Sequence, residues 1–252
     1  MAAKKIASSG DAGTIEGNSP FRFISRFPTF AAKNQLDSMK KLQSVIFDLD
    51  GTIADTLPLC VAAFKKSIEP LLKAELTTEA IVATFGPSEE GTIRQLIPSE
   101  EEQGLKAYLK HYQELHHMCP APFPGISEVL ELLQAKSIPL AMVTGKGSHS
   151  ARLSLKQFGL EKYFGVLETG SPDGPDKVNG IRRVLERLEA APAQSIYVGD
   201  SPSDIHYCRE IGIPIVAAAW ASTAEPEKLR PLHPDWLFYT VDDFRSWITE
   251  RL

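Results

Sequence analysis

Short apolar runs alternate with helix-like segments along the second half of this chain. Apolar runs that fit strands lie at 139–143, 166–168, 195–198, 214–218 and 236–238. Segments with helical spacing lie at 126–135, 148–158, 178–188, 204–211 and 242–248. A further strand is expected at 42–47, where an apolar run ends in a polar turn. Such alternation predicts an α/β fold with a Rossmann-like parallel sheet and helices on both of its faces.

The region between the first strand and Pro120 has helical spacing and no strand-like alternation. Helices are expected from Pro58, over 78–85, over 88–96 and from Ser99 to about His117. Ser99 and Glu102 have the spacing of a capping box at the start of the last of these helices. We therefore expect a small all-helical cap domain at 57–121, inserted into a core domain formed by 39–56 and 122–252.

Two carboxylates follow the first expected strand, in the sequence Asp48-Leu49-Asp50-Gly51-Thr52. Residues two apart in an extended chain project to the same face, so Asp48 and Asp50 are expected to point together into the crevice beyond the sheet. Two carboxylates this close repel each other unless a cation or a shared proton relieves them. The pair suits a Mg²⁺ site, or a nucleophile beside an acid–base, and the alternative is a solvated turn.

Three further segments that follow strands carry complementary groups. Thr144 and Gly145 lead into a helix N-terminus, which is a natural anion site. Lys177 stands at the start of a later helix, where the helix dipole does not favour a cation and an anionic partner is plausible. Asp200 and Asp204 form a second acidic pair after the strand at 195–198, where Asp204 alone would be explained as a helix N-cap.

Taken together, these residues resemble the haloacid dehalogenase superfamily, and specifically its phosphatases with a helical cap, such as phosphoglycolate phosphatase. The resemblance covers about residues 42–250 and consists of the Asp-x-Asp-Gly-Thr, Thr-Gly, Lys and Gly-Asp-x-x-x-Asp motifs in that order. One position departs from the pattern, because Val178 follows Lys177 where many relatives have proline. Lys146 is the nearest other lysine.

The resemblance implies a Mg²⁺-dependent phosphatase that hydrolyses a small phosphate monoester. Asp48 would be the nucleophile that forms an aspartyl phosphate, and Asp50 the acid–base. The implied phosphate-binding residues are Thr144, Gly145 and Lys177. The implied metal site is formed by Asp48, Asp50 through its backbone carbonyl, Asp200 and Asp204. The presence of Asp50 favours a phosphatase over relatives that cleave carbon–halogen bonds, in which this aspartate and the metal are not used.

Three alternatives share the same residues. A phosphomutase of the β-phosphoglucomutase kind is the first, and a pyrophosphatase and a non-catalytic binding protein on the same fold are the others. The cap is expected to set specificity, because cap loops close over such sites. Its candidate contacts are Glu89 and Arg94, and the alternative for Arg94 is an ion pair with Glu90 on a solvated helix face.

Composition excludes several classes of protein. The net charge is −5, and the acidic balance argues against a nucleic-acid partner. No apolar run is long enough to span a membrane. The three cysteines are far apart, which fits a reducing compartment such as the cytoplasm. The expected partner is a small phosphorylated metabolite, and the expected state is a monomer or homodimer.

The charge is distributed unevenly. Residues 1–41 carry seven Lys/Arg and three Asp/Glu, whereas residues 42–252 carry 20 and 29. Residues 1–38 show no helical or strand period, so we expect an N-terminal extension that is mostly disordered and lies outside the chemistry. It lacks the apolar core of a secretory signal. A native tail, a targeting segment and an added leader are the alternatives for it.

Overall fold

The computed structural model describes residues 42–252, and the expectations for residues 1–38 lie outside this range. Within it, six strands form one parallel sheet in the order β3-β2-β1-β4-β5-β6. They are β1 (Ser44–Phe47), β2 (Leu140–Val143), β3 (Val166–Glu168), β4 (Ser195–Gly199), β5 (Ile215–Ala218) and β6 (Trp236–Phe238). Each overlaps a predicted strand, and the sheet confirms the predicted α/β class.

Strand β1 lies inside the sheet between β2 and β4, and its side chains divide between two apolar layers. Val45 and Phe47 belong to one layer and Ile46 to the other. This division follows from the two-residue repeat of a strand that is buried on both faces. Because all the strands are parallel, their carboxyl ends meet at one edge of the sheet, and the end of β1 lies in the middle of that edge.

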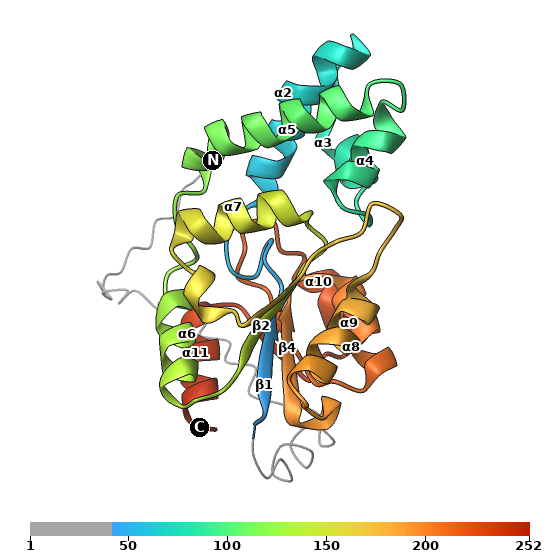
Figure 1. Cartoon of the computed structure of the whole chain (residues 1–252). Coiled ribbons are helices and arrows are strands. Elements are labelled where there is room, and N and C mark those ends of the chain that lie inside the picture. Colours follow the sequence, from blue (N-terminus) through green and yellow to red (C-terminus); the bar gives the residue numbers. More distant parts are fainter. Residues whose placement is uncertain (1–41) are drawn as a thin grey trace, which may run out of the picture.

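Helices cover both faces of the sheet (Figure 1). One side carries α6 (Ile126–Ala135) and α11 (Val241–Thr249), and the other carries α8 (Lys177–Arg187) and α9 (Pro202–Ile211). Helix α7 (Ser148–Phe158) lies across the upper end of the sheet in the view of Figure 1. The short remaining elements are η1 (Leu115–Met118), η2 (Glu161–Tyr163), η3 (Pro192–Gln194), α10 (Pro226–Leu229) and η4 (Arg230–Leu232).

The predicted all-helical cap is present above α7, on the side away from the sheet (Figure 1). It consists of α2 (Leu57–Leu72), α3 (Thr78–Val82), α4 (Glu89–Leu96) and α5 (Glu101–Glu114). Helices α2 and α5 pack closely, and the ring centroids of Phe64 and Tyr108 are 4.5 Å apart. The exact boundaries between cap and core stay predictions.

The predicted capping box at Ser99 and Glu102 is wrong. Helix α5 begins at Glu101 with Glu100 as its N-cap, and no side chain caps it. Ser99 therefore lies one residue before the N-cap, and Glu102 is one position too early to complete the box. A capping box forms instead at the start of α9, where Ser201 is the N-cap and Asp204 is the third helical residue.

Among residues 42–252, no helix has the length and apolar character that crossing a bilayer requires.

The aromatic cluster around Phe244 of α11 provides a test of the fold. Phe244 is fully buried, and its ring centroid lies 6.4 Å from Phe47, 6.0 Å from Phe238 and 6.1 Å from Trp247. We expect Phe244→Ala to lower the free energy of unfolding by about 3–5 kcal/mol, because it leaves a cavity between helix and sheet. Denaturant unfolding measures this change. Met118→Ala is the control, since Met118 is 48% exposed and its truncation is expected to have little effect.

Candidate active site

The carboxylate of Asp48 is held at the end of β1 by contacts on both of its oxygens. The backbone continues the sheet by one residue, since Asp48 N donates to Val198 O at 2.9 Å. Its Oδ1 accepts from the backbone N–H of Leu49 at 2.7 Å, and its Oδ2 lies 2.6 Å from Nζ of Lys177. Asp48 is only 4% exposed. The sheet therefore presents a buried, oriented carboxylate at the centre of its edge.

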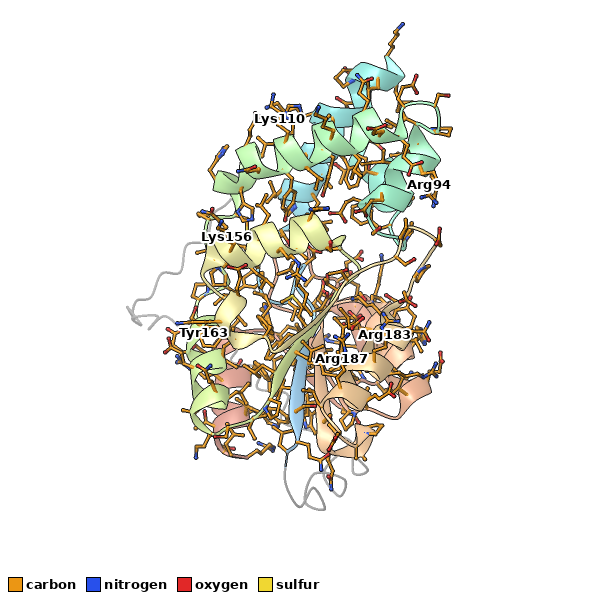
Figure 2. The ribbon with its side chains drawn as sticks, viewed as in Figure 1. Arg94, Lys110, Lys156, Tyr163, Arg183 and Arg187 are labelled. Carbon is orange, nitrogen blue, oxygen red and sulfur yellow. The ribbon has the colours of Figure 1, made fainter. Side chains whose placement is uncertain are left out.

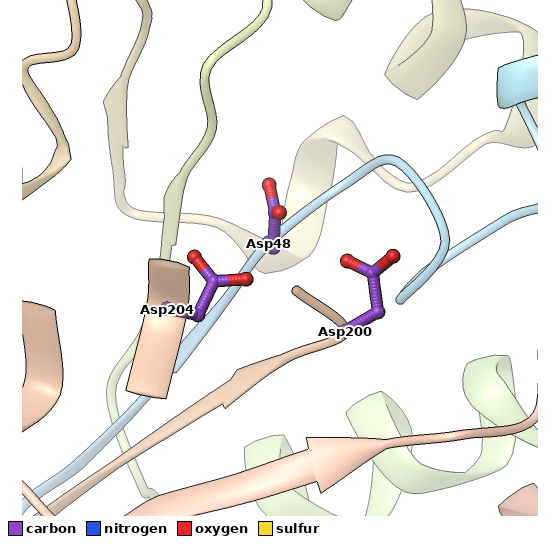
Figure 3. A group of neighbouring side chains, drawn as sticks. All are labelled: Asp48, Asp200 and Asp204. Atoms are coloured by element: carbon purple, nitrogen blue, oxygen red, sulfur yellow. The ribbon is translucent and has the colours of Figure 1, made fainter. Parts of the chain in front are cut away.

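Asp48, Asp200 and Asp204 come together at this edge, and these three carboxylates are called the acidic group below. One carboxylate oxygen from each lies within 4.8 Å of the others. Figure 3 shows the three side chains converging from the ends of two neighbouring strands and from the helix that follows β4. Asp50 is not part of this group, because its side chain turns to other partners.

Gly51 makes room for Asp200. Its backbone has φ +72°, and a Cβ placed there would lie 2.2 Å from Oδ2 of Asp200. A side chain at this position would therefore both strain the turn and displace the carboxylate. The glycine of the Asp-x-Asp-Gly motif is required by the acidic group itself.

Lys177 bridges two of the three carboxylates. Its Nζ lies 2.6 Å from Asp48 Oδ2 and 2.7 Å from Asp204 Oδ1. Burial lowers the pKa of Lys177, but the charges of Asp204 and Asp48 outweigh burial and hold this pKa well above its ordinary value. Lys177 thus stays a cation at the carboxylate that was predicted as the nucleophile, although Val178 follows it.

Asp204 is fixed from several directions. Its Oδ2 accepts from the backbone N–H of Ser201 at 3.1 Å and from the Ser201 hydroxyl at 2.7 Å, and its Oδ1 accepts from Lys177. It is therefore not the N-cap considered from the sequence but the other half of the capping box. One carboxylate oxygen holds the helix start, and the other faces the acidic group.

The acidic group is short of positive charge in the described part of the chain. Burial raises the pKa of Asp48 to about 6, with Lys177 opposing and Asp204 and Asp50 adding to the rise. The pKa of Asp200 is also raised, by burial first and then by Asp48 and Asp204. Its one side-chain hydrogen bond in residues 42–252 is a long contact of 3.4 Å from Thr52. A group of carboxylates in this condition suits a hard divalent cation.

Asp50 is oriented by Lys146, a residue to which sequence reasoning gave no role of its own. Its Oδ1 accepts from the hydroxyl of Thr56 and lies 3.1 Å from Nζ of Lys146. Burial lowers the pKa of Lys146, but Asp50 and other groups outweigh burial and raise it well above the ordinary value. The position of Lys146 beside the Thr-Gly motif was visible in the sequence, but its partner was not.

Thr144 and Gly145 lie where the sequence placed them, between β2 and α7. Thr144 is 2% exposed and its hydroxyl accepts from the backbone N–H of Lys146 at 3.2 Å. Gly145 lies on the wall of a cavity of about 320 Å³ that also includes Asp48, Asp50 and Lys177. Asp200 also lines this cavity, whereas Thr144 and Asp204 do not, so five of the seven predicted core residues surround one space between the sheet edge and the cap.

The two predicted cap residues have different surroundings. Glu89 lies on the cavity wall, but its carboxylate accepts from the backbone N–H of Gly147 and the hydroxyl of Ser150. It therefore joins α4 to the first turn of α7. Arg94 is not on the cavity wall and pairs with Glu101 at 3.2 Å and Asp173 at 3.3 Å rather than with Glu90. Figure 2 shows Arg94 at the outer side of the cap.

Comparison with known proteins places these features in a family. Residues 45–218 match the family described as haloacid dehalogenase-like hydrolase. A protein of Caldanaerobacter subterraneus, whose name marks it as a candidate pyrophosphatase PpaX, is 34% identical over 209 residues, which cover 81% of this chain and 91% of the relative. The phosphoglycolate phosphatase of Synechococcus elongatus is 28% identical over 217 residues, which cover 84% and 99%.

Solved structures give the same result. A haloacid dehalogenase-like hydrolase from Streptococcus pneumoniae superposes with a TM-score of 0.67 at 25% identity. The superposition covers 82% of this chain and 98% of that protein.

Removal of the Asp200 charge tests whether repulsion within the acidic group destabilises the fold. In the absence of divalent metal we expect Asp200→Asn to raise the free energy of unfolding at neutral pH by about 1–2 kcal/mol, because it removes a charge that burial and its neighbours disfavour. Since the folded-state pKa of Asp200 is raised, the gain should shrink as the pH falls and the wild-type carboxyl becomes protonated.

Denaturant unfolding in EDTA across a pH series measures this effect. Asp242→Asn is the control, since Asp242 is 76% exposed in a surface ion pair and should show no such pH-dependent gain. A loss of stability in Asp200→Asn at neutral pH would contradict the description.

Proposed function

Because this chain belongs to the haloacid dehalogenase-like hydrolases, we propose that it hydrolyses a small phosphate monoester through an aspartyl phosphate on Asp48, with Mg²⁺ as cofactor. The observation that carries the proposal is the pairing of a buried, oriented Asp48 with Lys177 at 2.6 Å. Lys177 provides positive charge where a phosphoryl group would approach the carboxylate. Positioning and charge neutralisation of this kind are most of what phosphoryl transfer requires.

The donor set supports a magnesium ion. Asp48, Asp200 and Asp204 supply carboxylate oxygens within 4.8 Å of one another, and burial together with the neighbouring carboxylates raises the pKa values of Asp48 and Asp200. Hard oxygen donors are the ligands that Mg²⁺ prefers. The backbone carbonyl of Asp50 is proposed as the fourth ligand that the protein provides. When bound, Mg²⁺ neutralises the repulsion between the anionic carboxylate and the anionic phosphate.

The residues of the chain account for each bond that changes. A carboxylate oxygen of Asp48 attacks phosphorus, and the bond between phosphorus and the ester oxygen breaks with its electron pair on that oxygen. Asp50 gives its proton to the departing oxygen. Asp50 then takes a proton from the water that attacks the aspartyl phosphate, which releases phosphate and restores the Asp48 carboxylate.

The surroundings of Asp50 support this acid–base role. Thr56 and Lys146 both occupy Oδ1, which leaves Oδ2 without a hydrogen bond to any residue in the range 42–252. The Asp50 side chain is 30% exposed and lies on the cavity wall. One oxygen is thus fixed, and the other remains for proton transfer to the substrate.

The relatives support the reaction type. The names of the two relatives, a candidate pyrophosphatase and a phosphoglycolate phosphatase, agree with hydrolysis at a phosphoryl group and differ in the substrate. The cysteines bear on the compartment. None of Cys60, Cys119 and Cys208 forms a disulfide in the described part of the chain, and all three are buried. We propose the cytoplasm as the compartment, since free thiols persist where the medium is reducing.

Replacing the proposed nucleophile is the direct test. We expect Asp48→Asn to abolish Mg²⁺-dependent release of phosphate from p-nitrophenyl phosphate, with a loss of at least about a thousandfold, since an amide cannot replace the attacking carboxylate. A steady-state phosphate assay measures the loss.

Asp173→Asn is the control for this variant, since Asp173 is 84% exposed, and it should retain activity. Circular dichroism of both variants checks that they fold. Full activity in a folded Asp48→Asn protein would exclude the aspartyl-phosphate mechanism.

Metal addition is a second test, independent of turnover. We expect Mg²⁺ to raise the melting temperature of the wild-type protein, because a ligand that binds only the folded state stabilises it. The rise should be larger at about pH 7.5 than at about pH 5, because protons compete with the metal for Asp48, whose pKa is about 6. Differential scanning fluorimetry measures both shifts, and an equal shift in Asp200→Asn would contradict the proposed site.

A further inference from the structure

The cavity has two ends with different chemistry. Its core end contains the groups that the proposed reaction uses, namely Asp48, Asp50 and Lys177. Its other wall comes from the cap and faces the part of the substrate that leaves with the ester oxygen. The cap wall therefore records what kind of leaving group the site accepts.

Apolar side chains make up most of this wall. The cap residues without charge that line the cavity are Leu57, Cys60, Phe64, Val82, Phe85, Gly86, Pro87, Thr92 and Tyr108. The ring of Phe64 lies 4.5 Å from Tyr108 and 5.8 Å from Phe85, centroid to centroid. The exposed ring of Phe85 is therefore backed by two aromatic rings that are almost fully buried. A flat apolar or aromatic group fits against such a surface.

Two of these residues are exposed although they are large and hydrophobic. Val82 and Phe85 are each 39% exposed, and in the described part of the chain Met118 is the one other exposed side chain of this kind. Met118 is not on the cavity wall. Apolar surface that is left open inside a cavity is surface that an apolar ligand covers.

The cap wall offers no cation to a second anionic group. Within residues 42–252 the cations on the cavity wall are Lys146 and Lys177, and both already contact carboxylates of the site. Glu89 is the charged residue that the cap contributes to the wall, and it is an acid. Arg94 is paired with Glu101 and Asp173 outside the cavity. A carboxylate or second phosphate on the leaving group would meet apolar rings and a carboxyl group.

The wall does offer hydrogen bonding without charge. Tyr108 is 1% exposed and lies on the cavity wall, and its hydroxyl has no hydrogen-bond partner in the described part of the chain. In contrast, the hydroxyl of Tyr112, one helical turn later, is paired with Ser154 at 2.8 Å. The Tyr108 hydroxyl suits a neutral polar substituent on an otherwise apolar group.

We infer that the substrate is a phosphate monoester whose organic half is uncharged and largely apolar, an aryl or alkyl group that packs against Val82 and Phe85, with the rings of Phe64 and Tyr108 behind them. This inference rests on the proposed phosphatase function and narrows it. It places esters with a second anionic group, such as phosphoglycolate and sugar bisphosphates, among the poor substrates, together with pyrophosphate, an anhydride whose leaving group is itself anionic.

A pair of aryl esters that differ in one carboxylate substituent tests the inference. Phenyl phosphate and 4-carboxyphenyl phosphate have the same aryl ring and leaving groups of similar acidity. We expect the wild-type enzyme to show a kcat/KM at least about tenfold higher for phenyl phosphate, since an unpaired charge in an apolar site is strongly disfavoured. Pyrophosphate and phosphoglycolate should also fall below phenyl phosphate.

A cation introduced on the cap wall should change this preference. Phe85→Arg places a positive group at a partly exposed wall position, and we expect it to narrow the ratio of the two kcat/KM values by at least about threefold. Met118→Arg is the matched control, because it adds the same group to an exposed cap position outside the cavity. It should leave the wild-type ratio unchanged.

The outcomes separate the inference from the proposed function. Equal or better turnover of 4-carboxyphenyl phosphate, or pyrophosphate as the best substrate, would overturn the inference and leave the phosphatase proposal standing. If the ratio of the two kcat/KM values is unchanged in a folded Phe85→Arg enzyme, the cap wall does not cause the preference for the uncharged ester, and the inference is overturned. No turnover of either aryl ester would overturn the phosphatase proposal and the inference with it.

Discussion

The repulsion between Asp48, Asp200 and Asp204 is the constraint on which the rest of the site depends. Three carboxylates within 4.8 Å of one another destabilise the fold at neutral pH unless positive charge is supplied. Lys177 compensates in part by contacting two of them, and Gly51 leaves the space that Asp200 needs. The remaining excess of negative charge suits a divalent cation. The sheet edge and the capping box hold the three carboxylates in place despite their repulsion.

The core of this arrangement was predictable from the sequence because it follows from local rules. The carboxyl ends of the strands in a parallel sheet meet at one edge, so the sequence alone predicts that Asp48, Thr144 and Asp200 lie close together. Lys146 was not assigned its partner because the contact joins residues 96 positions apart through side-chain packing. The Ser99 capping box failed for a local reason: the N-cap of α5 is Glu100, and this one-residue difference removed the required spacing. Pattern reasoning sets the elements, but not their ends.

The cap was the least predictable part of the site. Spacing indicated helices, but the helical period does not say which face of α2 or α5 meets the core. Glu89 and Arg94 were both candidates for contact with a substrate, and the structure separates them. Glu89 is buried against the first turn of α7, whereas Arg94 lies outside the cavity. A charged residue in the cap therefore indicates function only after its ion-pair partners are known, because surface pairing explains most such residues.

Lys146 contacts both the cap and Asp50, the proposed acid–base. Its Nζ lies 3.1 Å from Asp50 in the core, 3.0 Å from Sγ of Cys60 in α2, and 4.6 Å from the centre of the Tyr112 ring in α5. Because one buried cation contacts both units, the orientation of Asp50 depends on where the cap sits. Phe64 of α2 and Tyr108 of α5 lie on the cap wall of the cavity, behind the exposed ring of Phe85. Under the proposed mechanism, a substrate that packs against this wall would stabilise the arrangement in which Asp50 is held for proton transfer, and binding of the organic half would then be linked to the chemistry at phosphorus.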